Sequence, residues 1–116
     1  DQLVDHLAFK STWITQEMGL NPKELVLITT QGDSMAPTLN EGDLLLLDKR
    51  EKRVRNDGIY VIQRDADLIA KRLQLGFDGS VRIKSDNPAY ETQSIPEDRM
   101  DQLAIIGRVI WTGHRL

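Results

Sequence analysis

The stretch Ile59–Leu73, IYVIQRDADLIAKRL, contains two apolar runs separated by a short polar segment. The first run, Ile59–Ile62, is made of β-branched and aromatic residues, which favour strands. The second run is Leu68–Leu73, and the polar segment Arg64–Asp67 before it has the residue types of a turn. The stretch therefore predicts a β-hairpin.

Short apolar runs and turns alternate on both sides of this hairpin. Turns rich in Gly, Asn and Asp recur at intervals of about ten residues, a spacing typical of all-β domains. The other predicted strands are Leu25–Thr30, Leu44–Leu47, Ser80–Lys84 and Leu103–Trp111. This pattern predicts a mostly β domain, built as a barrel or a sandwich.

The first twenty residues have a different character. Residues 1–10 are mixed in composition and are expected to be the end of an interdomain linker. Residues 11–19 predict one short N-terminal helix, which Gly19 ends. We therefore expect residues 11–116 to form one domain, because a chain of 116 residues fits a single core.

The composition excludes several classes of function. The 15 basic and 18 acidic residues argue against a domain that grips a nucleic-acid backbone by itself. Because there is no cysteine, disulfides, thiolate zinc sites and cysteine nucleophiles are excluded. The aspartates are scattered over separate turns and strand ends, so neither a metal nor a cofactor is expected. No apolar run approaches the roughly 20 residues that cross a bilayer, and no membrane association is expected.

The segment Gly32–Thr38, GDSMAPT, places Ser34 on a turn bounded by glycine and proline. Glycine permits unusual backbone angles, and proline stops the continuation of a helix or a ladder. Such a turn can expose the serine hydroxyl and leave the backbone N–H groups of Asp33 and Ser34 free to bind an oxyanion. A serine in a turn is more often an ordinary turn residue, so this motif by itself does not predict catalysis.

Lys71 lies in the middle of a predicted strand, with apolar residues on its own face. Most strand lysines lie at an edge or extend to solvent, but burial among apolar groups lowers the pKa of a lysine by up to several units. A neutral lysine can accept the proton of a serine hydroxyl. Ser34 and Lys71 therefore predict the nucleophile and general base of a Ser-Lys peptidase. Histidine, the usual base, occurs only as His6 and His114, near the two ends.

Several motifs together resemble one protein family. Gly32–Leu39, followed by Glu41-Gly42-Asp43, resembles the serine motif of the LexA-type, S24-like Ser-Lys peptidases. This family includes the phage repressors of the CI type and the UmuD mutagenesis proteins. Ile69–Leu73 resembles the lysine motif of the family, at the separation from the serine that the family requires. Asp86-Asn87-Pro88 and Ile106–Ile110 resemble two further landmarks, and the early residues resemble the phage-repressor branch.

The resemblance implies a LexA- or signal-peptidase-like β fold in a cytoplasmic repressor whose N-terminal helix-turn-helix domain lies outside this chain. The present domain would form a homodimer, and the DNA-binding domains would address operator DNA. Ser34 would attack a peptide bond in the protein's own linker, with neutral Lys71 as general base, and a RecA filament would act as co-protease after DNA damage. The expected dimer-interface residues are Ile106, Val109, Ile110 and Trp111.

The sequence departs from the family pattern in one respect, and three other functions remain as alternatives to a self-cleaving repressor. The family cuts at Ala-Gly or Cys-Gly, and neither dipeptide occurs in this sequence, so the scissile bond is expected upstream of Asp1. The first alternative is a dimerisation and effector module that an anti-repressor releases without cleavage. The second is a UmuD-like mutagenesis protein. The third is a signal-peptidase-like enzyme that acts on other chains.

The run Lys49–Arg55 carries five positive charges and one negative charge. Such runs are most often solvated loops, and a contact with DNA or with the RecA filament is the alternative.

Overall fold

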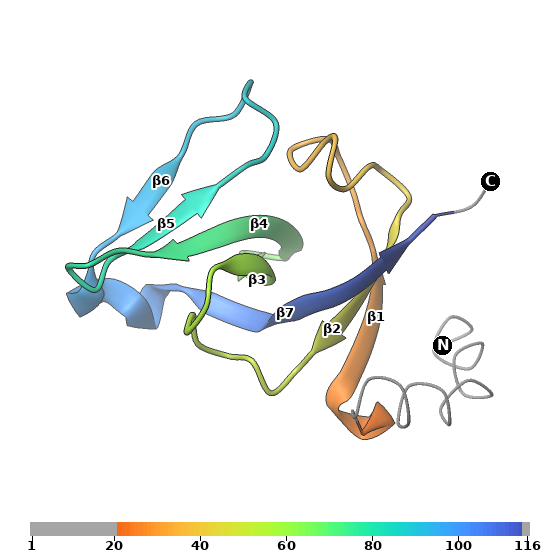
Figure 1. Cartoon of the computed structure of the whole chain (residues 1–116), viewed down its shortest axis with the longest axis horizontal. Coiled ribbons are helices and arrows are strands. Elements are labelled where there is room, and N and C mark those ends of the chain that lie inside the picture. The colour runs from red at the N-terminus through yellow and green to blue at the C-terminus, as the bar shows by residue number, and fades with distance from the viewer. Residues whose placement is uncertain (1–20, 115–116) are drawn as a thin grey trace.

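A computed structural model describes residues 21–114, so the predicted linker over 1–10 and the predicted helix over 11–19 lie outside the described part. The described residues form an antiparallel sheet of seven strands in the order β1-β2-β7-β3-β4-β5-β6 (Figure 1). The prediction of a mostly β domain is confirmed.

The observed strands are close to the six predicted ones, with one additional strand. Their bounds are β1 Leu25–Thr29, β2 Leu44–Asp48, β3 Gly58–Arg64, β4 Asp67–Leu75, β5 Val81–Lys84, β6 Gln93–Ile95 and β7 Ala104–Gly113. Two short 3-10 helices, η1 (Pro22–Glu24) and η2 (Glu97–Gln102), are also present. The sequence did not predict β6 or η2, because neither segment has a run of apolar residues.

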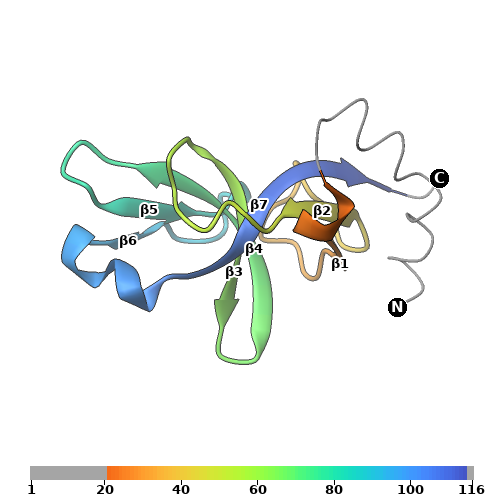
Figure 2. The ribbon, with the colours of Figure 1, turned by 90° about the horizontal axis from the view of Figure 1, so that it is seen from below.

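The predicted hairpin is present as β3 and β4. Arg64 pairs with Asp67 and Tyr60 pairs with Lys71, so Asp65 and Ala66 alone form the turn. Asp65 has a φ of 55°, a left-handed conformation that aspartate adopts more easily than most residues. The hairpin projects from the rest of the sheet (Figure 2), and its register decides which residues of β4 face the core.

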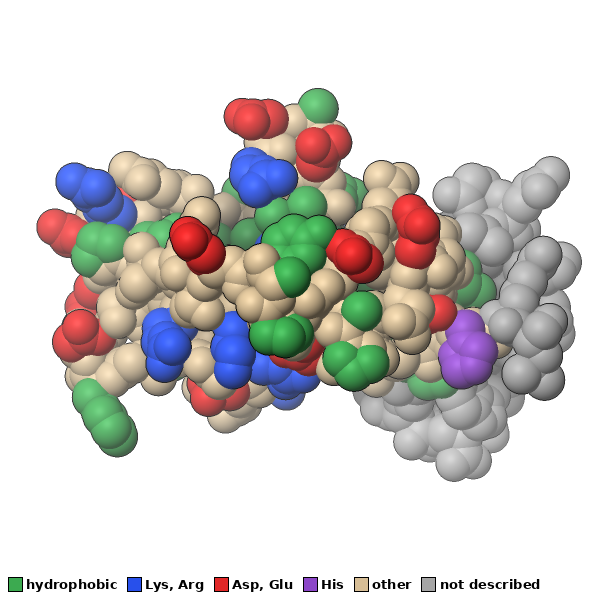
Figure 3. Space-filling model, turned by 90° about the horizontal axis from the view of Figure 1, so that it is seen from above, with side chains coloured by type: hydrophobic (Ala, Val, Ile, Leu, Met, Phe, Trp, Pro, Cys, Tyr) green, Lys and Arg blue, Asp and Glu red, His purple; other side chains and the backbone are tan. Residues whose placement is uncertain are grey.

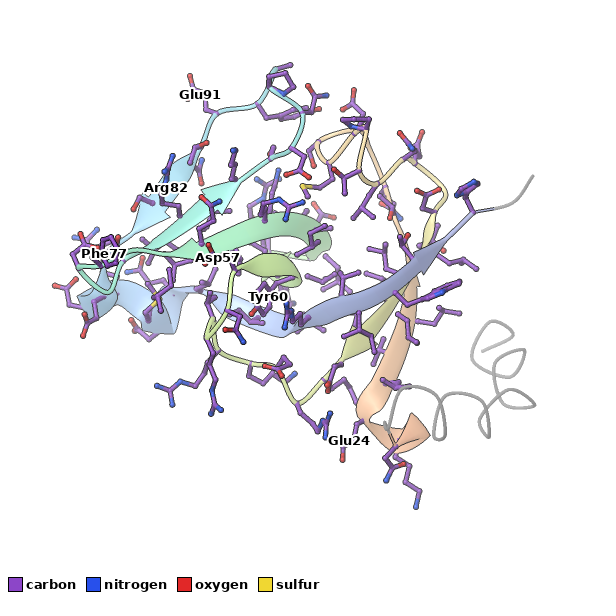
Figure 4. The ribbon with its side chains drawn as sticks, in the orientation of Figure 1. Glu24, Asp57, Tyr60, Phe77, Arg82 and Glu91 are labelled. Atoms are coloured by element: carbon purple, nitrogen blue, oxygen red, sulfur yellow. The ribbon has the colours of Figure 1, made fainter. Side chains whose placement is uncertain are left out.

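Strand β7 joins the two parts of the sheet, because it pairs with β2 on one side and with β3 on the other. Both of its faces carry apolar residues, which suits a strand that lies inside the sheet. An added Cβ at Gly107 would lie 2.7 Å from the carbonyl oxygen of Asp48, so the close approach of β7 to β2 requires glycine there. In Figure 4, Tyr60 lies at the middle of the sheet, where β3 runs beside β7.

The core has two clusters of buried side chains, and β3 contributes to both because successive strand residues point to opposite faces. Val61 belongs to the first cluster, and its neighbours Tyr60 and Ile62 belong to the second. The other buried members of the first cluster are Met35, Leu39, Leu45 and Leu47. The other buried members of the second cluster are Leu73 and Val81. The first cluster supports the turn that carries Ser34, and the second lies under the face of β4 that carries Lys71.

Candidate functional site

The turn that carries Ser34 and the loop that follows β5 lie side by side at one end of the sheet (Figure 1). The backbone N–H of Asn87 donates to the carbonyl oxygen of Ser34 over 3.0 Å. The side-chain amide of Asn87 donates to the carbonyl oxygen of Asp33, also over 3.0 Å. The hydroxyl of Tyr90 donates to the carboxylate of Asp33. The loop after β5 therefore fixes the backbone of the serine turn.

The serine turn is also anchored to the core by its own side chains. Met35 and Leu39 are buried in the first core cluster and flank the exposed tip of the turn. Ser34 itself is half-buried, and Gly32 has a φ of 76°, which favours glycine. Among the described residues, no acceptor is found for the backbone N–H groups of Asp33 and Ser34. As far as residues 21–114 show, both amides have the free donors that an oxyanion site requires, and that role stays a prediction.

A small cavity of about 30 Å³ lies beside Ser34. Its lining on the far side comes from β4, through Leu68, Ile69 and Ala70. Ser34 therefore shares a cavity with the segment immediately before Lys71. The hydroxyl of Thr30, which also lines this cavity, is buried and has no hydrogen-bond partner within the described residues.

Lys71 is half-buried in the middle of β4, as its position in the sequence predicted. Its amine donates a hydrogen bond of 2.7 Å to the hydroxyl of Ser85, which is buried. The ring of Tyr90 lies over the amine, with its centroid 5.4 Å from Nζ. In the described part of the chain no hydrogen bond joins Lys71 to Ser34. The two candidate residues are instead linked through the segment Ser85–Asn87.

The surroundings of Lys71 lower the pKa of its amine. Burial is the main cause, because it disfavours the charged form, and the positive charge of Arg64 acts in the same direction. The ring of Tyr90 and the hydroxyl of Ser85 both favour the ammonium form, so they oppose this shift. The lowered pKa raises the fraction of neutral amine near pH 7, which is the form that a general base needs.

A groove of about 460 Å³ begins at Lys71 and runs over β3, β4, β5 and β6. Isoleucine side chains contribute much of its lining, and Arg64, Glu91 and Gln93 add polar groups. Glu91 lies on the loop between β5 and β6 in Figure 4. Figure 3 shows the side of the molecule that is uppermost in Figure 1, where hydrophobic side chains near the middle lie between acidic ones. The lining of this groove mixes apolar and polar side chains, so it offers both apolar contacts and hydrogen-bonding groups to an extended peptide.

Asp86 connects the three elements of the site. Its carboxylate accepts two hydrogen bonds of 2.8 Å from the guanidinium of Arg72 on β4 and one of 2.6 Å from the hydroxyl of Thr38 in the serine turn. The hydrogen bond from Arg72 lowers the pKa of Asp86 to about 2, and the bond from Thr38 adds to this effect. Asp86 therefore holds the loop after β5 against both candidate catalytic segments.

Asp86→Asn is expected to destabilise the fold by about 1–2 kcal/mol at neutral pH, because it removes the charge that pairs with Arg72. Because the pKa of Asp86 is lower in the folded state than in the unfolded state, its carboxylate stabilises the fold at pH values above the ordinary aspartate pKa. This contribution disappears as the pH falls from about 4 to about 2. Urea unfolding at a series of pH values measures both effects. Asp98→Asn, at an exposed position, is the control. A difference between wild type and Asp86→Asn that stays constant down to pH 2 would contradict the assignment.

The four residues predicted at a dimer interface all lie on β7. Ile106 and Val109 pack against the first core cluster, and Ile110 is half-buried. Trp111 is 39% exposed, so it offers the largest apolar surface of the four. Their role in an interface stays a prediction.

The sequence analysis named Ser34, Lys71 and Asp33 as candidate site residues, a role that stays a prediction. It did not name Ser85 or Tyr90, which contact Lys71 in the structure. Ser85 precedes the recognised Asp86-Asn87-Pro88 turn, and that position was its only signal. The contact with Lys71 depends on the pairing of β4 with β5, which no local pattern specifies.

In the basic run, Arg50 is bound to Asp48 and Lys52 donates to the carbonyl oxygen of Ile106 over 2.8 Å. Two of its five cations thus hold the loop between β2 and β3 to the sheet. Among residues 21–114, no helix has both the length and the apolar character that a membrane span needs.

Comparison with known proteins gives a consistent result. The family model described as Peptidase S24-like matches residues 1–110. A 26 kDa repressor protein of Escherichia phage HK022 is 38% identical over 77% of this chain and 38% of its own length. An uncharacterised HTH-type transcriptional regulator of Haemophilus influenzae is 31% identical over 85% of this chain and 41% of its own length. The HTH-type transcriptional regulator PrtR of Pseudomonas aeruginosa is 27% identical over 80% of this chain and 38% of its own length. The chain thus spans about two-fifths of the length of these relatives.

Proposed function

The chain belongs to the Peptidase S24-like family, and on this basis we propose that it is the C-terminal domain of a phage-type, LexA-like repressor that cuts its own linker. One observation carries the proposal. Ser85–Asn87 binds the amine of Lys71 through Ser85 and the backbone of Ser34 through Asn87. A nucleophile and a base held by the same short segment suit a reaction in which a proton passes between them.

In the proposed reaction, the Ser34 hydroxyl attacks the carbonyl carbon of the scissile peptide bond. Neutral Lys71 accepts the hydroxyl proton and then donates it to the leaving amine. The backbone N–H groups of Asp33 and Ser34 stabilise the negative charge that forms on the carbonyl oxygen. Water then hydrolyses the acyl-enzyme, with Lys71 again as base. The groove beside Lys71 holds the linker in an extended conformation.

Cleavage would act as a switch because of how the repressor binds DNA. A homodimer formed through this domain, with the exposed Trp111 in the interface, links two DNA-binding domains. These two domains then bind one operator together. The cut separates the DNA-binding domains from the dimer. Each of them then binds the operator alone, so the affinity for the operator falls. A RecA filament formed after DNA damage is the proposed co-protease, and the reaction takes place in the cytoplasm. The similarity to a phage repressor protein and to two HTH-type transcriptional regulators supports this assignment.

We expect the full-length protein to cut itself upstream of Asp1 during incubation at alkaline pH. Below the pKa of Lys71, the rate is expected to rise about tenfold per pH unit, because the neutral fraction of the amine rises by that factor. Intact mass spectrometry over time measures the rate and the cut position. The same protein at neutral pH, with and without activated RecA, is the control. A rate that does not change between neutral and strongly alkaline pH would count against lysine as the base.

A second function is favoured by the contact that Lys71 makes. Its amine is bound to Ser85 and not to Ser34, as expected for a pair that is retained but unused. In that case the domain is a dimerisation module that an anti-repressor releases. Absence of any cut at alkaline pH and with activated RecA would favour this function over the first.

A further inference from the structure

We propose that Ser85 is a positioning residue for Lys71, whose hydroxyl holds the amine in the orientation that lets its lone pair face the nucleophile. The inference rests on the proposed peptidase function. It assigns a role to a residue that does not touch the scissile bond.

The register of the sheet places Ser85 opposite Lys71. Arg72 of β4 pairs with Lys84 of β5, and the strands run antiparallel, so the next positions outward are Lys71 and Ser85. Residues directly opposite in an antiparallel pair point to the same face of the sheet. Ser85 follows the last paired residue of β5, so the pairing of the two strands brings its hydroxyl to the amine of Lys71, 2.7 Å away.

Ser85 has little freedom to move away from Lys71. It is 5% exposed, and the next residue, Asp86, is held by both Arg72 and Thr38. Fixing a lysine amine costs considerable side-chain conformational entropy, because a flexible stem of four carbons separates the amine from the backbone. The fixed hydroxyl of Ser85 binds the amine at the end of the Lys71 side chain, so the amine is already positioned before the substrate binds.

The direction of the hydrogen bond explains why this contact helps a base. A neutral amine has two N–H donors and one lone pair. Because Nζ donates to the hydroxyl oxygen of Ser85, one donor is used and the lone pair remains available on another side of the nitrogen. The ring of Tyr90 covers a further side. Ser85 and Tyr90 thus limit the directions in which the lone pair can face.

Other charged and titratable groups lie near the amine, and they remain in place when Ser85 is changed. Arg64 comes from β3, and Tyr90 and Glu91 come from the loop between β5 and β6; all three line the same groove as Lys71. Burial, and to a smaller extent the charge of Arg64, lower the pKa of Lys71, while a hydroxyl that accepts from the ammonium raises it. Removal of the Ser85 hydroxyl should therefore lower that pKa further.

The test is the pH profile of self-cleavage in full-length Ser85→Ala, Ser85→Thr and Ser94→Ala. For Ser85→Ala we expect a plateau rate about 10- to 100-fold below wild type, because the base is poorly oriented, and a midpoint at lower pH. Ser85→Thr keeps the hydroxyl and should restore both values. Ser94→Ala, the same change at an exposed position of β6, should match wild type. A purely structural role would lower the rate without moving the midpoint, and that result would overturn the proposal.

A second measurement separates this proposal from the proposed function. Acetic anhydride labels neutral amines, so labelling across a pH series, read by peptide mass, gives the titration midpoint of Lys71. Full-length Ser34→Ala serves as the background, and Lys84 is the internal reference. If Ser85→Ala lowers the labelling midpoint and the protein with Ser34 intact never cuts itself, the peptidase function is lost but the Lys71–Ser85 contact stands. Unchanged midpoint and cleavage rate would overturn the role of Ser85 and leave the peptidase function standing. If Ser85→Ala does not fold, Ser85→Cys keeps the volume with a weak acceptor.

Discussion

Ser34→Ala is expected to abolish self-cleavage of the full-length protein without unfolding the domain. The loss of the nucleophile of a serine peptidase lowers the rate by about 10⁴-fold or more. The turn should keep its shape, because Met35 and Leu39 anchor it in the core and Asn87 binds its backbone. None of these contacts uses the Ser34 hydroxyl.

The measurement is a time course of intact mass at alkaline pH, combined with urea unfolding of the same variant. Ser94→Ala is the matched control, because it removes the same hydroxyl from an exposed strand. We expect the unfolding midpoint of Ser34→Ala to stay near that of wild type. Cleavage of Ser34→Ala at a rate within tenfold of wild type would show that another group is the nucleophile.

Lys71→Met is expected to lower the self-cleavage rate by about 10²- to 10⁴-fold, the usual contribution of a general base. Methionine replaces most of the apolar stem of lysine and lacks the amine. The fold should lose little stability, since removal of the buried charge offsets the hydrogen bond lost at Ser85. The net change in unfolding free energy should lie within about 1 kcal/mol.

Two further variants test the reason for this loss. Lys71→Arg keeps the positive charge but cannot give up its proton in a protein, so it should be as inactive as Lys71→Met. Lys84→Met changes an exposed lysine on β5 and should keep the wild-type rate and pH profile. An active Lys71→Arg variant would mean that position 71 supplies charge and not a base.

Much of the architecture was predictable from local patterns. The runs Ile59–Ile62 and Leu68–Leu73 predicted the central hairpin, because β-branched runs and turn residues are signals within one short segment. The same holds for the glycine-bounded turn at Ser34. Strand β6 was not predictable, since it has three residues and little apolar surface. It forms because β5 offers an edge with which it can pair.

The sequence by itself therefore determined six of the seven strands, the serine turn and the two residues that the peptidase hypothesis needs. Only the tertiary structure decided that β7 lies between β2 and β3, that the core splits into two clusters, and that Ser85 lies opposite Lys71. The reason is that pairing between distant strands depends on register and packing across the whole sheet. The loop after β5 becomes part of the site for the same reason. Its contacts with Asp33, Ser34 and Lys71 join segments far apart in the chain.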